Sequence, residues 1–285
     1  MISGVKQLVD AELDGKERRY SWRKTPSVTT NAGFWFDLSM SPGRPVPKYW
    51  FDSAPLTARV ASYSADGGLE HGGGVSPSEK YLRLTTAIAT AATALPLTMI
   101  LCDYLLYYPT IDESSLEEHV MDNTTTLSRY EDGEGVQIVG VIVSASSGLA
   151  CDFVIDYTNS RGEDKTTTAT LTPSPGTPGQ LTSTGQSYTT QQGPFIKLAD
   201  GDTGARKINK VTMLSADTGL FSLILVKPLG TSVIREITAP AEKDYFMESS
   251  VIPRIYDDAY LSFLCLPQGT LASTVLMGDI KTIWT

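Results

Sequence analysis

The stretch GLFSLILVKP, residues 219–228, decides the fold. It is a nearly continuous apolar run that begins after one glycine and ends at Pro228. Short apolar runs bounded by such residues are typical of strands that are buried on both faces. We therefore predict a central strand here, with the other strands of the fold arranged around it.

Further strand-like segments occupy most of the chain. In one of them, Phe153, Ile155 and Tyr157 alternate with more polar positions, as expected of a half-buried strand. Turn-forming residues rich in Gly, Pro, Asn and Asp separate the segments. The strands are predicted at residues 33–40, 57–63, 97–108, 136–145, 150–158, 165–172, 207–214, 219–227, 232–238, 259–265 and 274–284.

Many strands at this spacing, with only two or three short helices, predict a mainly β fold. We expect an antiparallel β-sandwich or a jelly-roll-like arrangement. One helix is predicted within residues 2–13, where apolar residues recur at helical spacing and Gly15 follows. A helical insertion is predicted near residues 77–95, with Ser76 as its cap and Pro77 at its first position.

The domain organisation follows from these elements and from the length of 285 residues, which suits one large β-rich domain. Residues 1–30 are predicted to form an N-terminal helix and an extended arm, and residues 31–285 a single domain. The densest basic stretch, KERRYSWRK at 16–24, is interpreted as a solvated arm or a contact for an acidic protein neighbour. The polar residues 173–194 are expected to form a projecting loop or a flexible tip.

The composition excludes two classes of partner. A formal net charge of −9 gives a surface that repels nucleic acid, so no nucleic-acid partner is expected. The longest apolar stretch, residues 95–109, carries Asp103 and is too short to span a bilayer. The first residues lack the apolar core and basic start of a signal peptide. We expect a soluble protein, made in a cytoplasm, with no membrane contact.

The three cysteines are distant from one another in the sequence, and no CxxC occurs. Cys102 and Cys265 lie in apolar runs, which indicates buried, reduced thiols that pack as small hydrophobic groups. A disulfide between two of the three cysteines, Cys151 included, stays open at this stage.

Residues with catalytic or metal-binding character are few. His71 lies in LEHGGG, a loop that could form an oxyanion hole, but no G-x-S-x-G nucleophile motif accompanies it. His119 follows two glutamates and is interpreted as a solvated surface residue. Asp200 and Asp202 could offer oxygen ligands to Ca²⁺, although a tight turn explains them better. We therefore predict a protein that is not an enzyme and that uses no cofactor and no metal.

The aromatic segment FWFDLSMSPGRPVPKYWF, residues 34–51, points to an interface instead. Phe34 and Phe36 share one face of a strand, so Trp35 points the other way. Exposed Tyr, Trp and Arg are enriched at protein–protein interfaces. In the alternative interpretation, the aromatic clusters close one internal core. The interface candidates are Trp22, Trp35, Arg44, Tyr49, Trp50 and Phe51.

Four blocks of the sequence resemble one family. YSWRKTPSVTTNAGFWFDLSMSPGRPVPKYW (20–50), the glycine-rich block that begins GGLEHGGGVSPSEKYLRL (67–113), ADGDTGARKINKVTMLSADTGLFSLILVKPL (199–229) and YLSFLCLPQGTLA (260–272) are similar to tailed-bacteriophage virion structural proteins. The resemblance covers most of the chain. It implies a place in a virus particle, and it supplies no catalytic residues to carry over.

The leading hypothesis is therefore a capsid decoration or cement protein. It would bind major capsid or other virion proteins and its own copies, as a homo-oligomer for which a trimer is one option. It would be assembled in the host cytoplasm and located in the virion. One alternative is a tail, neck or receptor-binding component in which Tyr49, Trp50, Tyr107 and Tyr108 stack on a glycan. A hydrolase that uses His71 or a carboxylate pair is the least favoured alternative.

Overall fold

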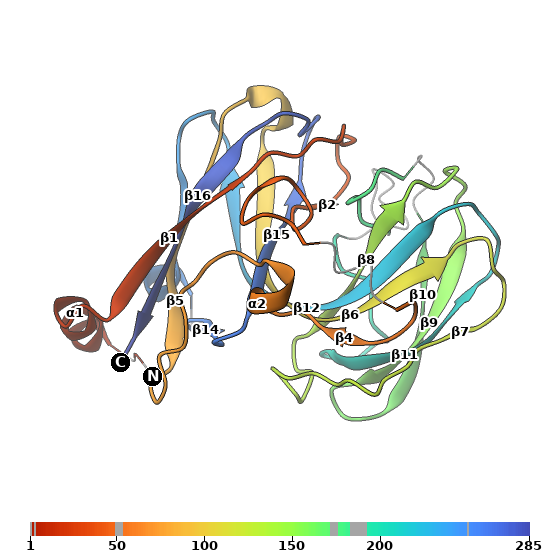
Figure 1. Cartoon of the computed structure of the whole chain (residues 1–285), viewed down its shortest axis with the longest axis horizontal. Coiled ribbons are helices and arrows are strands. Elements are labelled where there is room, and N and C mark those ends of the chain that lie inside the picture. Colours follow the sequence, from red (N-terminus) through yellow and green to blue (C-terminus); the bar gives the residue numbers. More distant parts are fainter. Residues whose placement is uncertain (1, 3, 49–53, 172–175, 183–192, 250) are drawn as a thin grey trace.

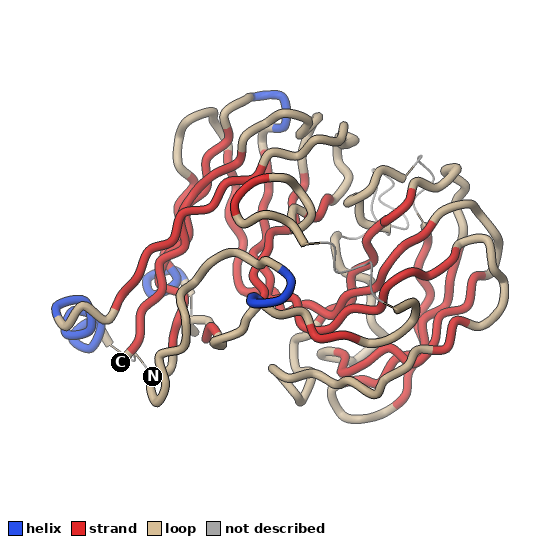
Figure 2. The backbone as a smooth tube through the Cα atoms, in the orientation of Figure 1, coloured by secondary structure: helices blue, strands red, loops and turns tan. Residues whose placement is uncertain are grey.

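The computed structural model places most of the chain in antiparallel strands, in two lobes that lie side by side (Figures 1 and 2). The predicted mainly β, sandwich-like fold is thereby confirmed. No helix among the described residues is long and apolar enough to cross a membrane. The description covers all residues except 1, 3, 49–53, 172–175, 183–192 and 250.

Three sheets carry the fold, and each is antiparallel. The first sheet has the order β13-β5-β16-β1-β3, with β14 beside β5. The second has the order β2-β15-β6-β12-β8, with β4 beside β6, and the third has the order β10-β9-β11-β7.

The first sheet comprises β1 (Glu17–Lys24), β3 (Gly43–Arg44), β5 (Lys80–Ala89), β13 (Ala241–Asp244), β14 (Arg254–Ile255) and β16 (Leu276–Trp284). The second comprises β2 (Phe36–Asp37), β4 (Arg59–Val60), β6 (Leu97–Asp112), β8 (Gln137–Ser144), β12 (Leu220–Ile234) and β15 (Tyr260–Leu266). The third comprises β7 (His119–Val120), β9 (Asp152–Asn159), β10 (Asp164–Thr170) and β11 (Ala205–Met213). The helices are α1 (Val5–Leu13), α2 (Tyr63–Asp66), α3 (Tyr245–Glu248) and the 3-10 turn η2 (Ala92–Ala94).

The two long strands β6 and β12 join the lobes, because they run from one lobe into the other (Figure 1). At one end, Leu97 and Ile234 pack in the core shared with the first sheet. At the other end, Phe221 packs in the core shared with the third sheet, where its ring centroid lies 5.0 Å from that of Phe153. The apolar run at 219–228 is central, as predicted, with β6 on one side and β8 on the other.

The strands predicted at 219–227 and 232–238 are largely one strand, β12. The pairing of β12 with β6 shifts register between Pro228 and Gly230. Proline cannot donate to a ladder and is tolerated in strands at bulges, which explains how β12 continues through it.

The second sheet closes on itself through residues 179–182. On one side of this segment, the amide of Leu181 donates to the carbonyl of Trp35, beside β2, at 2.9 Å. On the other side, the amide of Thr182 donates to the carbonyl of Gly140 in β8, also at 2.9 Å. The sheet is therefore a closed ring, and its inner face carries a separate buried cluster. This cluster includes Trp35, Cys102, Tyr104, Tyr107, Val139, Val141, Leu181, Ile224 and Tyr260.

The helix predicted near residues 77–95 is wrong, because residues 80–89 form the strand β5. β5 is hydrogen-bonded to β16 on one side and to β13 and β14 on the other. Thr85, Thr86 and Ile88 are β-branched and favour a strand over a helix. The apolar spacing also fits a helix, but the pairing of β5 with strands on both of its edges selects the extended conformation.

The N-terminal segment is part of the first sheet. The helix predicted within residues 2–13 is confirmed as α1. The basic stretch that follows is extended, but it is not a solvated arm, because β1 pairs with β16 along its whole length. Of the polar stretch 173–194, most lies outside the described residues, and the described part includes the segment that closes the second sheet.

Candidate interaction surface

The predicted aromatic anchors lie mainly inside the protein. Trp22 is buried between the first and second sheets, with its ring centroid 4.9 Å from that of Phe263. Trp35 is buried inside the closed second sheet. Arg44 is exposed on the short edge strand β3. Neither tryptophan offers an exposed contact in the isolated chain. The candidates Tyr49, Trp50 and Phe51 lie outside the described residues.

The alternation predicted for the aromatic strand is confirmed, since Phe36 and Trp35 belong to different buried clusters on opposite faces. The expectation that the second face is exposed is wrong, because ring closure covers it. This outcome supports, for Trp35, the alternative in which the aromatic residues fill a core.

His71 is a buried residue whose ring is hydrogen-bonded to the backbone. Its Nε2 atom lies 2.9 Å from the carbonyl oxygen of Ala259, and its side chain is fully buried. Burial, together with the nearby Lys80 ammonium, lowers the pKa of His71 to about 4, so the ring is neutral at pH 7. The Lys80 ammonium donates to the carbonyls of Gly72 at 2.8 Å and Gly73 at 3.2 Å. These contacts fasten the glycine-rich loop to the first sheet.

The other candidates for chemistry are also engaged in structure. His119 is buried, not solvated as expected, and pairs through its backbone with Val211. The Asp202 carboxylate accepts hydrogen bonds from Tyr157 Oη at 2.6 Å and from Asn159 Nδ2 and Arg161 Nη2 at 2.8 Å. These bonds occupy the oxygens that the Ca²⁺ interpretation requires. Within the described residues, no group of three or more His, Cys, Asp or Glu could hold a metal ion.

A buried ion pair marks the junction of the lobes. Arg129 Nη2 lies 2.9 Å from Asp103 Oδ1 and also donates to the carbonyls of Tyr104 and Ala61. The amide of Tyr260 donates to the same carboxylate at 3.1 Å. Burial raises the pKa of Asp103 to about 6, although the Arg129 charge opposes the shift. The Asp103 carboxylate is engaged by Arg129 and by the Tyr260 amide. It therefore holds the strands and the loop together and is not available as a reactive group.

The cysteines agree with the prediction of buried thiols. Cys102, Cys151 and Cys265 are free and fully buried. Burial raises the pKa values of Cys102 and Cys265 well above the ordinary range of a thiol, so neither is a reactive thiolate at pH 7.

The most distinctive exposed surface is at the end of the first-sheet lobe, where α1 and α3 lie. The inner side of α1 packs Leu8 and Ala11 into a cluster with Tyr81 and Ile283, against which Phe246 of α3 is packed. The outward sides of both helices leave large apolar side chains in water. We call the exposed apolar side chains of this region the end face. They are Val5, Val9 and Leu13 on α1, Met247 on α3 and Val251 after α3, which are 62%, 45%, 81%, 72% and 72% exposed.

The sequence contains the signal for this face in a form that is easily misinterpreted. Val5, Val9 and Leu13 recur every four residues and share one side of α1. Leu8 belongs to the adjacent, buried side. The two apolar sides of this short helix look like one broad stripe in the sequence, and only the packing shows which side is uncovered.

Charged pairs border the end face. Lys6 and Asp10 form an exposed pair at 2.6 Å on α1, and Lys281 binds Glu12 at 3.1 Å. An apolar patch with a polar rim is the usual anatomy of a protein–protein contact.

Comparison with known proteins identifies no relative: no family model, no curated protein and no solved structure matches the chain. The virion family therefore stays a prediction from the resemblance of the four sequence blocks.

Proposed function

We propose that this protein is a non-enzymatic structural component of a tailed-phage virion, and specifically a capsid decoration or cement protein. The observation that carries the proposal is the end face, which exposes four large apolar side chains on α1 and α3 and a fifth, Val251, in the segment after α3. Exposing such a face to water is thermodynamically unfavourable. Burying it against a complementary apolar partner lowers the free energy. The partner is a major capsid protein or another copy of this chain.

Two further observations support an assembly role. The buried charged groups at the lobe junction and in the glycine-rich loop are engaged in hydrogen bonds that hold the fold together. The net charge of −9 suits a position on the outer surface of a shell, away from packaged DNA.

The glycan-binding alternative loses part of its support. Tyr107 and Tyr108 are buried and cannot stack on a sugar. Tyr108 Oη donates to Asn123 Oδ1 at 2.8 Å and accepts from the amide of Ile208 at 3.0 Å, which gives it a structural role. The remaining aromatic candidates of that alternative, Tyr49 and Trp50, lie outside the described residues.

The test is a double variant, Val9→Glu with Leu13→Glu, which keeps residues of good helix propensity on α1. Purified protein is added to virus particles that lack it, and its occupancy is measured by quantitative mass spectrometry. We expect occupancy to fall by at least roughly tenfold, because charges enter an apolar contact. Circular dichroism confirms that the variant is folded.

The matched control is Leu116→Glu with Leu214→Glu, which changes two side chains of similar exposure that lie outside the end face. Occupancy of the control variant should equal that of the wild type. Wild-type occupancy of the Val9/Leu13 variant contradicts the proposed docking face. Particles that lack the protein and have normal heads but truncated tails, seen by negative-stain microscopy, assign it to the tail instead.

A further inference from the structure

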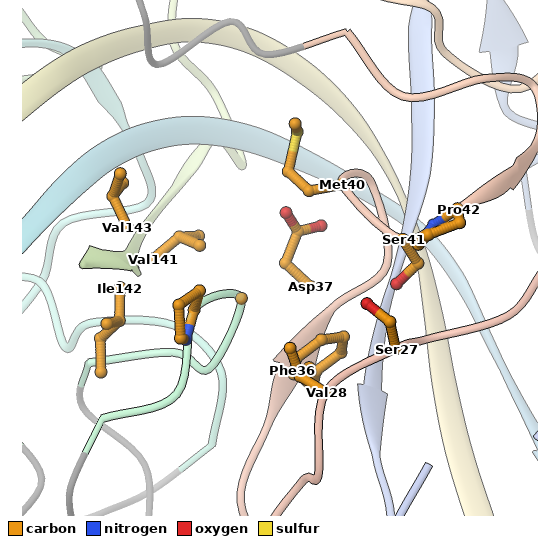
Figure 3. Close-up of a pocket in the computed structure, with 12 residues that line it drawn as sticks. Ser27, Val28, Phe36, Asp37, Met40, Ser41, Pro42, Val141, Ile142 and Val143 are labelled. Atoms are coloured by element: carbon orange, nitrogen blue, oxygen red, sulfur yellow. The ribbon is translucent and has the colours of Figure 1, made fainter. Parts of the chain in front are cut away.

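A cavity of about 170 Å³ lies at the rim of the closed second sheet (Figure 3). One wall is formed by residues 141–143 of β8. The other wall comes from the β2 region and the loop after it, and includes Phe36, Met40 and Ser41. The mouths of closed sheets are common places for small-ligand sites.

The lining is mostly apolar and carries one unsatisfied polar atom. Ser41 is 4% exposed, and its Oγ atom has no hydrogen-bond partner within the described part of the chain. Figure 3 shows this oxygen turned towards the side chain of Ser27, which also lines the cavity. A buried hydroxyl without a partner is destabilising unless another molecule supplies the missing bond.

Among the described residues that line the cavity, none offers a free charge. The Asp37 carboxyl is fully buried and accepts hydrogen bonds from Ser39 and from Tyr104 Oη, the latter at 2.6 Å. The nearby Lys24 ammonium donates to the carbonyls of Ser39 at 3.2 Å, Ser41 at 3.1 Å and Pro45 at 2.9 Å. Both charged groups are therefore engaged within the protein, and neither is available to an ionic ligand.

We propose that this cavity binds a small neutral molecule, about the size of a phenyl ring, whose hydroxyl or carbonyl oxygen accepts a hydrogen bond from Ser41 Oγ. The size follows from the volume, because an apolar cavity of about 150 Å³ holds benzene. Neutrality follows from the absence of a free charge, since an ion in this cavity loses its hydration without compensation. The proposal does not depend on the proposed function.

The experiment titrates the full chain with phenol, benzene and benzoate while methyl resonances are followed by NMR. The walls offer methyl reporters on Val28, Met40 and Ile142. Phenol should shift these resonances saturably, benzene should bind more weakly, and benzoate should leave them unchanged. Ser41→Ala should weaken phenol binding on the order of fivefold and leave benzene binding unchanged, because one hydrogen bond is lost.

Two variants complete the design. Val143→Trp fills the space and should abolish binding of both neutral probes, which keeps the test decisive if Ser41→Ala is unstable. Ser128→Ala removes an exposed serine elsewhere and should bind phenol like the wild type. Phenol that causes no saturable shift at these methyl groups overturns the proposal. An unchanged ratio of phenol to benzene affinity in folded Ser41→Ala overturns the assigned hydrogen bond.

Discussion

The two lobes share the strands β6 and β12, yet their outer surfaces differ. On the third sheet, polar side chains pair across strands: Thr166 Oγ1 donates to Asp156 at 2.9 Å, and Thr170 Oγ1 donates to Asp152 at 2.6 Å. The first-sheet lobe instead presents the apolar end face on α1 and α3. Both lobes have a buried core of their own, and the proposed docking role rests on this difference between their outer surfaces.

The two lobes also differ in how they hold a buried acidic side chain. At the lobe junction, the Asp103 carboxylate meets an arginine. The carboxyl of Glu113, just after β6 in the third-sheet lobe, has no hydrogen-bond partner on either oxygen among the residues that the structure describes. The first arrangement stabilises the joint between the lobes. The second makes one lobe sensitive to pH.

The largest effect is expected from Arg129→Met, which breaks the joint that both lobes share. It leaves the buried Asp103 carboxylate without its charge partner, and the free energy of unfolding should fall by about 3–5 kcal/mol. Urea denaturation measures the loss. The control is Lys197→Met, which removes an exposed pair with Asp200 and should cost less than about 1 kcal/mol. Equal losses of unfolding free energy for the two variants contradict the stabilising role assigned to the Arg129–Asp103 pair.

A smaller effect, confined to the third-sheet lobe, is expected from Glu113→Gln. Burial and the neighbouring Asp217 carboxylate raise the pKa of Glu113 from 4.5 to about 8. Between these values the unfolded chain has lost the proton and the folded chain keeps it, so stability falls as pH rises. The slope is up to about 1.4 kcal/mol for each pH unit, and it ends near the folded-state pKa.

Glutamine stays neutral, so Glu113→Gln should remove this slope and stabilise the protein at pH 8, on the order of 2 kcal/mol. Thermal and urea unfolding between pH 5 and pH 9 measure both the slope and the stabilisation. Glu118→Gln changes an exposed carboxylate and should keep the wild-type profile. If stability above pH 6 falls as steeply in Glu113→Gln as in the wild type, a group other than Glu113 is responsible, since the contribution of Asp103 ends near its pKa of about 6.

The smallest effect on stability is expected at the end face itself. Leu13→Glu and Leu214→Glu both change exposed leucines, one on each lobe, and each should alter the free energy of unfolding by no more than about 0.5 kcal/mol. Only Leu13→Glu should reduce binding of a hydrophobic dye such as ANS, because only Leu13 belongs to an extended apolar face. If the two variants bind the dye equally, Leu13 does not belong to an extended apolar face, and the two lobes do not differ in this respect.

Much of the fold was predictable from local patterns. The central run at 219–228 is a buried strand because so long an apolar segment needs cover on both faces. The helix α1 was predictable from its spacing and from the glycine after it. The strand β5 was not, because its apolar residues satisfy helical and extended spacing alike, and pairing with β16 and β13 selects the strand.

The candidate site shows where this kind of reasoning stops. Alternation correctly assigns Phe36 and Trp35 to opposite faces of a strand, but it does not reveal whether the second face meets water. In the same way, the spacing of Val5, Val9 and Leu13 identifies a shared side of α1 without saying that it is uncovered.

The sequence by itself therefore determined the β-rich class, the position of most strands and of α1, the acidic surface and the burial of the thiols. These properties follow from composition and from periodicities over a few residues. Only the tertiary structure decided which faces are covered, because residues 179–182 must meet β2 and β8 to bury Trp35, and β5 and α3 must meet α1 to leave Leu13 outside. Contacts between segments far apart in the chain leave no periodic trace in either segment alone.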